Sequence, residues 1–308
     1  MKNLWQIVFL SAITLLTLGC SEESPPLPED EHPTAPIPGI DIVHLPIVVH
    51  VIHFGEEIGT GPNLPDDQIH RQIEILNEDF RKKKGSRGYN DHPDGADSMI
   101  EFTLAQRDPQ SNPFDGINRI DASRMKVENK GNNPNHYAQY AYWDPNLYIN
   151  VWTTPLAMET QCLVLGSASG PLTDLPGTEL LSIPTDHDSE GILINWMHFG
   201  ESSTDCHAKY GRTLTHEMGH YLGLLHLWAG NNCEQNDYCD DTPAVDAPVF
   251  GKIPYTGCDG ELVMIGNYMN FSDDEVMNIF TRDQVDRMHY VLMHHPGRNS
   301  LMTSSALP

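Results

Sequence analysis

The sequence predicts an α/β (α+β) fold, and three observations predict it. Residues 45–52 (LPIVVHVI) form an apolar, β-branched run that is typical of a buried strand. Residues 63–80 carry apolar side chains at helical spacing. Residues 100–104 and 147–152 then predict two more strands, so that strand, helix, strand and strand follow one another, as they do in layered α/β folds.

The helix over residues 63–80 has a clear start and a clear end. Residues 63–67 (NLPDD) place a proline and two acids in the first turn, where proline needs no hydrogen bond and carboxylates face the positive helix end. The apolar positions that follow are Ile69, Ile73, Leu76 and Phe80. Three lysines at residues 82–84, directly before Gly85, suit the negative end of the helix.

The rest of the chain offers weaker strand signals and one more helix. Residues 163–165 and 192–194 are short apolar runs that predict strands. Thr281 with Gln284 forms a capping-box pattern at the start of a last helix, residues 281–293. Because no repeat and no second linker is visible, these elements predict one domain over residues 40–308.

The charge of the chain limits its partners. Among 308 residues, Asp and Glu number 43 and Lys and Arg 18, a formal net charge of -25. Nucleic-acid binding needs basic patches and none is visible, so the sequence predicts no nucleic-acid partner. The negative charge also favours solubility and disfavours anionic membrane surfaces.

The first twenty residues predict export. Lys2 precedes an apolar stretch, residues 4–18, that is too short and too weakly flanked to be a convincing membrane span. It ends in LTLGC, which resembles the lipobox of bacterial lipoproteins, where the cysteine, here Cys20, is lipidated and becomes the N-terminus. A lipid on Cys20 would anchor the protein to a membrane without spanning it. The alternative is an ordinary secretory signal with an incidental cysteine, and both predict export.

Residues 21–39 predict a tether between this signal and the domain. They are rich in proline and acid, and they contain too little apolar area to offset the entropy of ordering. Residues 21–23 (SEE) resemble the acidic export tags of surface-exposed lipoproteins, which favours the outer membrane or cell surface over other parts of the envelope. Release of the domain to the medium is the other outcome that export allows.

Five cysteines beyond Cys20 fit an oxidising compartment, where disulfides persist. Their connectivity cannot be deduced from the sequence. Because the number is odd, at least one thiol is expected to be free or paired elsewhere. The five are Cys162, Cys206, Cys233, Cys239 and Cys258.

The most informative segment for chemistry is residues 211–226, GRTLTHEMGHYLGLLH. Positions four apart are neighbours on a helix, so His216 and His220 can point at a single metal ion. Gly223 can adopt a left-handed conformation, which ends the helix and brings His226 in from another side. Three neutral imidazoles and one water make an open tetrahedral zinc site, the arrangement that catalysis requires.

Glu217 lies one step round the same helix, within reach of a zinc-bound water. Zinc lowers the pKa of its water and polarises a scissile carbonyl, so we predict that Glu217 takes the proton and passes it to the leaving amine. The opposite face of the helix should pack on the core through Leu214, Met218, Leu222 and Leu225. Most other members of the 16 histidines are expected to be ordinary surface or core residues.

The motif HExxHxxGxxH resembles that of the metzincin metalloproteases, which also carry a methionine turn beneath the metal. Residues 267–271 (NYMNF) provide this turn, with Met269 as its methionine. Three short sequence motifs narrow the resemblance to the pappalysin family: GRT before the zinc helix, DTP at residues 241–243 and SDD after the turn. LPIVVHVI, LNEDF and IEF in the N-terminal half agree, so the resemblance spans residues 43–292.

This resemblance implies an endopeptidase with one catalytic zinc. It implies a twisted mixed sheet with helices above a zinc helix, a long cleft, and a smaller irregular C-terminal subdomain with Met269 as a packing floor. The substrate would be a protein or peptide in extended conformation, paired with the strand at residues 163–168. An ordinary core strand is the alternative reading of that segment.

The chain departs from the family pattern at two places. Where relatives commonly carry a tyrosine two residues past the turn methionine, this chain has Phe271, which has no hydroxyl to ligate zinc or stabilise an oxyanion. Some relatives are held inactive by an upstream cysteine, whereas none lies between Cys20 and Cys162 here. Latency by that route is therefore not expected.

Two acidic clusters complete the predicted site. Asp237, Asp240 and Asp241 are candidate calcium ligands, because relatives carry calcium near here and calcium binds several oxygens. A simple solvated loop is the alternative. A second cluster lies where the family has its specificity pocket, and an acid there would favour Arg or Lys after the cut; its members are Asp273, Asp274 and Glu275.

Two other functions are compatible with parts of the sequence. An exported zinc-binding adhesin or receptor would keep the fold without catalysis, but such a protein has no need of a base like Glu217 beside three metal ligands. A metal-dependent amidase acting on cell-wall material is compatible with the zinc motif alone, but the family words argue against it. The sequence therefore favours the protease.

Overall fold

The computed structural model describes residues 41–131, 133–156, 165–182, 184, 189–202, 206–234, 236–258 and 260–308. These residues belong to one compact unit, Pro33–Pro308. The predicted export signal, the predicted tether and Cys162 lie outside the described residues. Within the described part of the chain, no helix is both long enough and apolar enough to cross a membrane.

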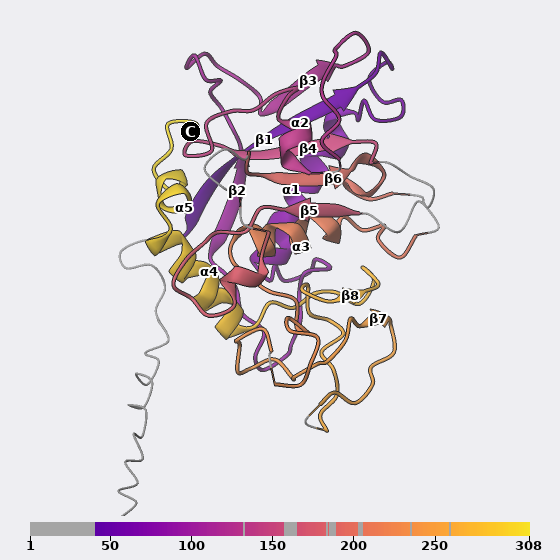
Figure 1. Ribbon diagram of the computed structural model, residues 1–308, viewed down its shortest axis with the longest axis vertical. Coiled ribbons are helices and arrows are strands. Elements are labelled where there is room, and N and C mark those ends of the chain that lie inside the picture. Colours follow the sequence, from indigo (N-terminus) through magenta and orange to yellow (C-terminus); the bar gives the residue numbers. More distant parts are fainter. Residues whose placement is uncertain are drawn as a thin grey trace, which may run out of the picture. The chain divides into compact units, whose positions relative to one another are not determined.

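The fold is a mixed sheet with a few helices, followed by a largely irregular segment (Figure 1). The strands are β1 Val43–His53, β2 Ile100–Leu104, β3 Ile117–Asp121, β4 Ile149–Thr154, β5 Gly166–Ala168, β6 Ile192–Asn195, β7 Phe250–Gly251 and β8 Phe271–Ser272. The helices are α1 Asp66–Phe80, α2 Pro134–Tyr137, α3 Arg212–Tyr221, α4 Arg282–His294 and α5 Pro296–Leu301, with single 3-10 turns at Thr178–Leu180 and Trp196–His198.

The main sheet has the order β2-β1-β4-β6-β5. β3 also pairs with β1, along the second half of that strand, after the residues that pair with β2. β1 pairs in parallel with β2, β3 and β4, and β4 pairs in parallel with β6. Among the described strands of this sheet, only β5 runs antiparallel, at the edge beside β6. Strands at the centre of a parallel sheet are covered on both faces, which explains why β1 is buried and mostly apolar over residues 45–52. The predicted mixed α/β sheet is therefore confirmed.

α1 and α3 cover one face of the sheet. Alternate side chains of the central strands, such as Ile47, Val49 and Val151, enter a single core with residues of both helices. The side chains between them, such as Val48 and Trp152, enter two smaller clusters on the other face. α3 packs against β5 and β6, and it lies below them in Figure 1. This places the predicted zinc helix directly under the edge of the sheet.

Several predicted elements are found close to their expected positions. α1 begins after Pro65 and ends at Phe80, so the three lysines follow the helix instead of forming its last turn. α4 begins with the predicted capping box, in which the hydroxyl of Thr281 accepts from the amide of Gln284. Residues 163 and 164 of one weak strand prediction lie outside the described residues, and β5 begins shortly after them.

The cysteines match the expectation of an oxidising compartment. Cys233 and Cys258 form a disulfide across 25 residues of the C-terminal segment. Cys206 is also disulfide-bonded. Among the described cysteines, only Cys239 is free, and it is buried. This confirms that at least one thiol beyond Cys20 has no disulfide partner.

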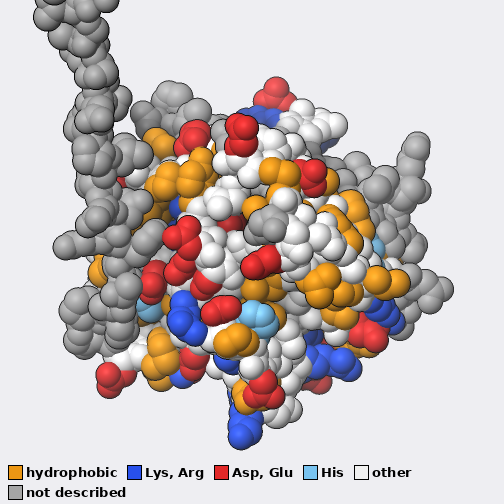
Figure 2. All heavy atoms as spheres, turned by 90° about the horizontal axis from the view of Figure 1, so that it is seen from below, with side chains coloured by type: hydrophobic (Ala, Val, Ile, Leu, Met, Phe, Trp, Pro, Cys, Tyr) orange, Lys and Arg blue, Asp and Glu red, His pale blue; other side chains and the backbone are white. Residues whose placement is uncertain are grey.

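The acidic character of the chain is visible at its surface. On the face shown from below in Figure 2, acidic side chains are scattered among hydrophobic ones. Several of the basic side chains form ion pairs with carboxylates. Examples are Arg71 with Glu78 at 2.9 Å and Lys252 with Asp273 at 3.8 Å. Basic charge on the described surface is thus partly neutralised by local ion pairs.

Candidate active site

The turn after α3 brings the third histidine to the first two. Gly223 has a φ of 93°, the left-handed conformation that the sequence predicts. The amide of Leu224 donates to the carbonyl of Gly219 at 2.9 Å, and the amide of Gly223 donates to that of His220, which closes the helix end. A side chain at Gly223 would also lie 2.6 Å from Val291 of α4. The chain therefore reverses here and returns His226 to the helix.

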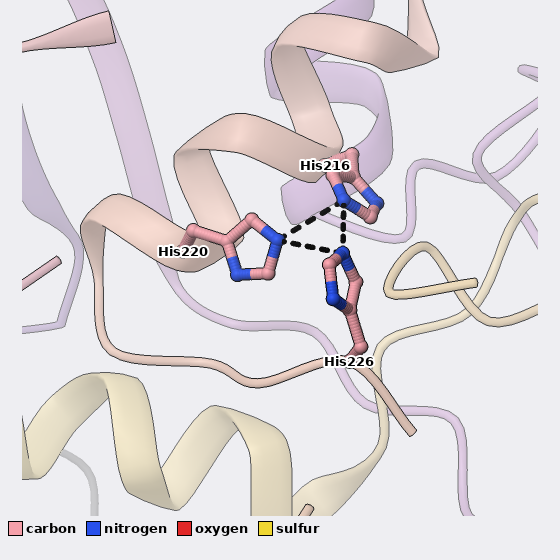
Figure 3. Close-up of side chains that lie close together, drawn as sticks. All are labelled: His216, His220 and His226. Carbon is pink, nitrogen blue, oxygen red and sulfur yellow. Dashed lines mark hydrogen bonds between the residues drawn. The ribbon is translucent and has the colours of Figure 1, made fainter. Parts of the chain in front are cut away.

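The three histidines converge on one point (Figure 3). The Nε2 atoms of His216 and His220 are 3.1 Å apart, and Nε2 of His226 lies 3.1 Å from the first and 3.0 Å from the second. Zinc binds imidazole nitrogen at about 2.0–2.1 Å, which places nitrogens around a tetrahedral ion about 3.3 Å apart. The observed triangle is close to that size.

The other ring nitrogens show which atoms face the centre as lone pairs. Nδ1 of His216 donates to the carbonyl of Tyr268 at 2.7 Å, and Nδ1 of His220 donates to that of Leu224 at 2.8 Å. Each ring is then neutral with an unprotonated Nε2. Burial lowers the pKa of His216 to about 3 and that of His220 to about 4. Neutral nitrogens held this close repel one another unless they share a cation, so the donor set fits a zinc ion.

Glu217 faces the same cavity as the histidines. Its side chain is buried, and burial raises the pKa of this carboxyl to about 8. A divalent cation nearby opposes that shift because it favours the ionised form. β5 passes directly over Glu217: a Cβ added to Gly166 would lie 2.9 Å from Cγ of Glu217 and 2.9 Å from the carbonyl of Leu193. Glycine at 166 therefore lets the strand approach the carboxylate.

Replacement of Gly166 by alanine is expected to lower kcat/KM by about ten- to a hundredfold, because the new methyl group would displace either Glu217 or β5. Peptide hydrolysis by purified variants checks this, with circular dichroism to establish that the fold is kept. Ser167→Ala in the same strand is the control, since it adds no atoms. Unchanged activity of Gly166→Ala would show that this close approach does not matter for catalysis.

The methionine turn lies against the zinc helix. A Cβ added to Gly219 would lie 2.5 Å from the sulfur of Met269, so the turn packs directly on α3. The amide of Met269 donates to the side chain of Asn267 at 2.9 Å, which holds the turn in shape. The neighbouring carbonyl of Tyr268 is the acceptor for His216. The turn thus supports both the helix and one imidazole.

Aromatic rings surround His226. The indole of Trp228 stacks on its imidazole with ring centroids 4.3 Å apart and planes 7° from parallel. The ring of Phe271 lies 4.9 Å from His226 and 5.7 Å from His216. Phe271, which stands where the family resemblance implies a tyrosine, therefore lies against two of the three histidines. Trp228 is a site residue that the sequence motif does not include, and its position two residues after His226 is the one local signal for it.

A cavity of about 540 Å³ opens onto these residues. The residues that line it include the edge strand β5, residues 180–182, Phe250, Phe271 and Met277. Of the acids that follow the methionine turn, Asp274 lines the cavity. Asp273 and Glu275 are not among the lining residues and instead pair with Lys252.

Of the three aspartates predicted to bind calcium, Asp240 and Asp241 lie at the start of α4. Asp237 accepts from the hydroxyl of Thr242 at 2.6 Å, and burial raises the pKa of this carboxyl to about 7. The amides of Asp240 and Asp241 donate to Asp283. Oδ2 of Asp237 and Oδ1 of Asp241 are buried without a hydrogen-bond partner among the described residues.

Two groups of His, Cys, Asp or Glu side chains in the described part of the chain are close enough together to be tested as metal sites. One is the histidine triad, and the other joins Asp246 to Cys233 and Cys258. The two cysteines of the second cluster are bonded to each other, so they are not free to bind a metal ion. The calcium candidates form no cluster of this kind.

Known proteins are similar to this chain in sequence and in fold. Residues 132–293 match the peptidase family described as pregnancy-associated plasma protein-A. An extracellular metalloprotease of Colletotrichum graminicola is 29% identical over 244 residues, which cover 78% of this chain and 73% of that protein. Extracellular metalloprotease 1 of Coccidioides posadasii is 45% identical over 80 residues, 25% of this chain and 29% of that protein.

Among solved structures, Tannerella forsythia mature mirolysin in complex with a cleaved peptide superposes with a TM-score of 0.68 at 28% identity. The match covers 85% of this chain and 96% of that chain. The family match alone spans more than half of the 308 residues, and it confirms the pappalysin resemblance of the sequence. The chain belongs to the pregnancy-associated plasma protein-A family of peptidases and is a zinc-dependent metalloendopeptidase.

Proposed function

We propose that this peptidase cleaves internal peptide bonds of extracellular proteins or peptides, with His216, His220 and His226 as zinc ligands and Glu217 as general base. One observation carries the proposal. Three Nε2 atoms lie 3.0–3.1 Å from one another at the cavity that Glu217 also lines. A binding protein would need the three ligands but not the carboxylate beside them.

Different residues of the site have different roles in hydrolysis. A zinc ion held by the triad supplies Lewis acidity toward the scissile carbonyl and the attacking water. The carboxylate of Glu217 accepts the proton of that water and later gives it to the leaving amine. The carbonyls of Tyr268 and Leu224 keep the first two imidazoles neutral and oriented. Phe271 contributes no hydroxyl with which to stabilise an oxyanion.

β5 supports binding of the substrate in extended conformation. This strand ends the sheet on one side, pairs only with β6 among the described strands, and lines the cavity with Gly166, Ser167 and Ala168. A peptide that adds to its free edge as a further strand would pass over Glu217 and the triad. Main-chain hydrogen bonds would then give affinity, and the cavity would give side-chain selectivity.

Digestion of casein or gelatin by the purified domain tests the proposed activity. Hydrolysis should stop when a chelator removes the metal and return when zinc is added back. An unbiased cleavage-site profile of the same preparation would give the sequence preference. A protein that holds stoichiometric zinc and cleaves none of these substrates would instead favour the binding-protein reading.

Asp274 is the proposed specificity residue, for substrates with Arg or Lys after the cut. It lines the cavity and is held by the backbone amides of Tyr210 and Arg212, which bond to Oδ2 at 2.8 and 3.2 Å. Asp274→Asn keeps an oxygen for these amides but removes the charge. The variant is therefore expected to lower the preference for Arg over Leu by at least about tenfold.

Matched peptides that differ only in the residue after the scissile bond measure this preference as a ratio of kcat/KM values. Asp273→Asn and Glu275→Gln are the controls, because these side chains pair with Lys252 and do not line the cavity. A profile without any basic preference in the unmodified protein would remove the proposal.

Calcium binding at Asp237, Asp240 and Asp241 is a separate proposal. Its support is the pair of buried carboxylate oxygens without partners, since such oxygens are costly unless a cation or a donor meets them. Calcium is then expected to raise the thermal midpoint of the protein more than magnesium does, and Asp237→Asn should abolish the difference. Equal midpoints with calcium, magnesium and chelator would refute the site.

Export and anchoring are proposed from the N-terminal residues. The relatives described above are named extracellular metalloproteases, which supports export of this chain. The cysteine at position 20 supports lipid anchoring in the envelope, with the predicted tether at residues 21–39 between lipid and domain. Labelling of cells with a radioactive fatty acid should mark the wild-type protein but not Cys20→Ser. An unlabelled wild-type protein in the culture medium would favour the ordinary secretory signal.

A further inference from the structure

Arg212 stands between two buried aspartates at the inner wall of the cavity. It is the first residue of α3, and both Arg212 and Asp274 line the cavity. The other aspartate is Asp79, which lies near the end of α1, 133 residues before Arg212 in the sequence. The side chains of Asp79 and Arg212 are 0% and 2% exposed, so water does little to screen the charges here.

The guanidinium of Arg212 is engaged with Asp79. Its Nη2 donates to Oδ1 of Asp79 at 3.1 Å, and its Nη1 donates to the carbonyl of Tyr210 at 2.9 Å. Oδ2 of Asp79 accepts from the hydroxyl of Thr215 at 2.7 Å, which fixes the carboxylate between the two partners. Of the ion pairs among described residues, none joins the guanidinium of Arg212 to Asp274.

Asp274 therefore has no ion-pair partner among the described residues, although the nearby charge of Arg212 favours its ionised form against burial, which raises the pKa of this carboxyl. Its hydrogen bonds come from backbone amides, which carry no net charge, whereas the charge of Arg212 is offset by Asp79. The three groups together carry one net negative charge. If Asp79 were neutral, the positive charge of Arg212 would offset Asp274, since unit charges a few ångströms apart interact strongly where water is excluded.

Two further polar atoms at this wall point to the same kind of ligand. The hydroxyls of Thr213 and Ser272 are buried without a hydrogen-bond partner among the described residues, and both residues line the cavity. A guanidinium has five donors and an ammonium has three, so a basic side chain would find acceptors beyond a single carboxylate here.

We propose that Asp79 is a positioning residue for substrate selection, although it does not line the cavity. By engaging Arg212, it leaves Asp274 free to attract the Arg or Lys side chain that follows the scissile bond. This inference rests on the proposed specificity of Asp274. It assigns to the LNEDF segment of α1 a role in choosing the substrate, in addition to its role in packing α1 against α3.

The test measures kcat/KM at about pH 8 for two peptides that differ only in Arg or Leu after the cut. At this pH, Asp79 is ionised, since burial raises its pKa only to about 6. Asp79→Asn keeps the shape of the side chain: its oxygen can still accept from Arg212, and its Nδ2 can donate to the hydroxyl oxygen of Thr215. It is expected to lower the Arg-to-Leu ratio by at least about tenfold while hydrolysis of the Leu peptide changes by no more than about twofold.

A double variant, Asp79→Leu with Arg212→Met, is the matched control. It removes both buried charges together, an exchange that proteins often tolerate, and it leaves Asp274 uncompensated. The Arg-to-Leu ratio of this variant should therefore stay close to that of the wild type. If Asp79→Asn does not fold, this variant decides: a folded double variant that has lost the basic preference would overturn the inference.

The other outcomes separate this inference from the proposal beneath it. If Asp79→Asn slows both peptides equally, Asp79 has only a structural role, and the inference is wrong while Asp274 can still be the specificity residue. An unchanged ratio in Asp79→Asn, with a reduced ratio in Asp274→Asn, leads to the same conclusion. A wild-type protein without basic preference would instead contradict the proposed specificity itself.

Discussion

Glu217→Gln is expected to lose essentially all peptide hydrolysis, with kcat/KM lower by at least about a thousandfold. Glutamine has nearly the same shape but cannot accept the proton of the attacking water. The carboxylate is buried at the cavity and lies under the edge strand, so no other group can readily replace it there. Turnover of a quenched fluorescent peptide measures the loss.

Zinc content separates this chemical effect from a loss of metal. Glu217→Gln should hold one zinc per chain, as the wild type does, because the three histidines are untouched. Glu74→Gln serves as the control, since Glu74 lies on the exposed side of α1 and its side chain is 67% exposed. Activity of Glu217→Gln within tenfold of the wild type would mean that another group acts as base.

His226→Ala is expected to lose both the metal and the activity. Two ligands, His216 and His220, would remain on α3, and a site with two protein ligands binds zinc much more weakly than one with three. The loss should also lower stability, because a ligand that binds only the folded state stabilises it by about 2.7 kcal/mol at a concentration of one hundred times its Kd. Zinc analysis after dialysis and thermal unfolding measure the two effects.

The control for His226→Ala is His44→Ala, a histidine whose side chain is 49% exposed on β1 and far from α3 in sequence. It should keep its zinc, its activity and its thermal midpoint. Addition of zinc should raise the midpoint of the metal-depleted wild type but leave that of His226→Ala nearly unchanged. A His226→Ala protein that retains stoichiometric zinc would exclude this histidine as a required ligand.

Local sequence was sufficient to predict the parts of the site that lie on one continuous segment. The spacing of His216 and His220 is set by the helical repeat, and the direction of the turn at Gly223 is set by its freedom to adopt positive φ. The position of His226 follows from these two properties. α1 and α4 could also be predicted from the sequence, since their amphipathic patterns and start signals are local.

Other strands could not be predicted from the local sequence, because their stability comes from pairing with distant strands. β3 has the sequence INRID, which is mostly polar and forms a strand only because it pairs with the second half of β1. β7 and β8 are two residues each and pair Phe250 with Phe271 across the chain. Intrinsic strand preference is weak compared with such tertiary context.

The roles of the acidic residues also depended on the fold. Asp273, Asp274 and Glu275 are equivalent as a run of acids, yet only Asp274 lines the cavity while its neighbours meet Lys252. Asp79 carried no functional signal in the sequence. Its significance appears only where α1 packs on α3 and brings it to Arg212.

The sequence by itself determined the α/β class, the metal-binding motif and its family, because these depend on composition, on the helical repeat and on the conformational freedom of one glycine. Tertiary structure alone decided which strand forms the free edge above Glu217, which acid faces the cavity, and which charge is left without an ion-pair partner there. Such properties are sums over groups distant in the chain. Burial removes the solvent screening between them, so their positions in space, and not their order in sequence, set the chemistry of the site.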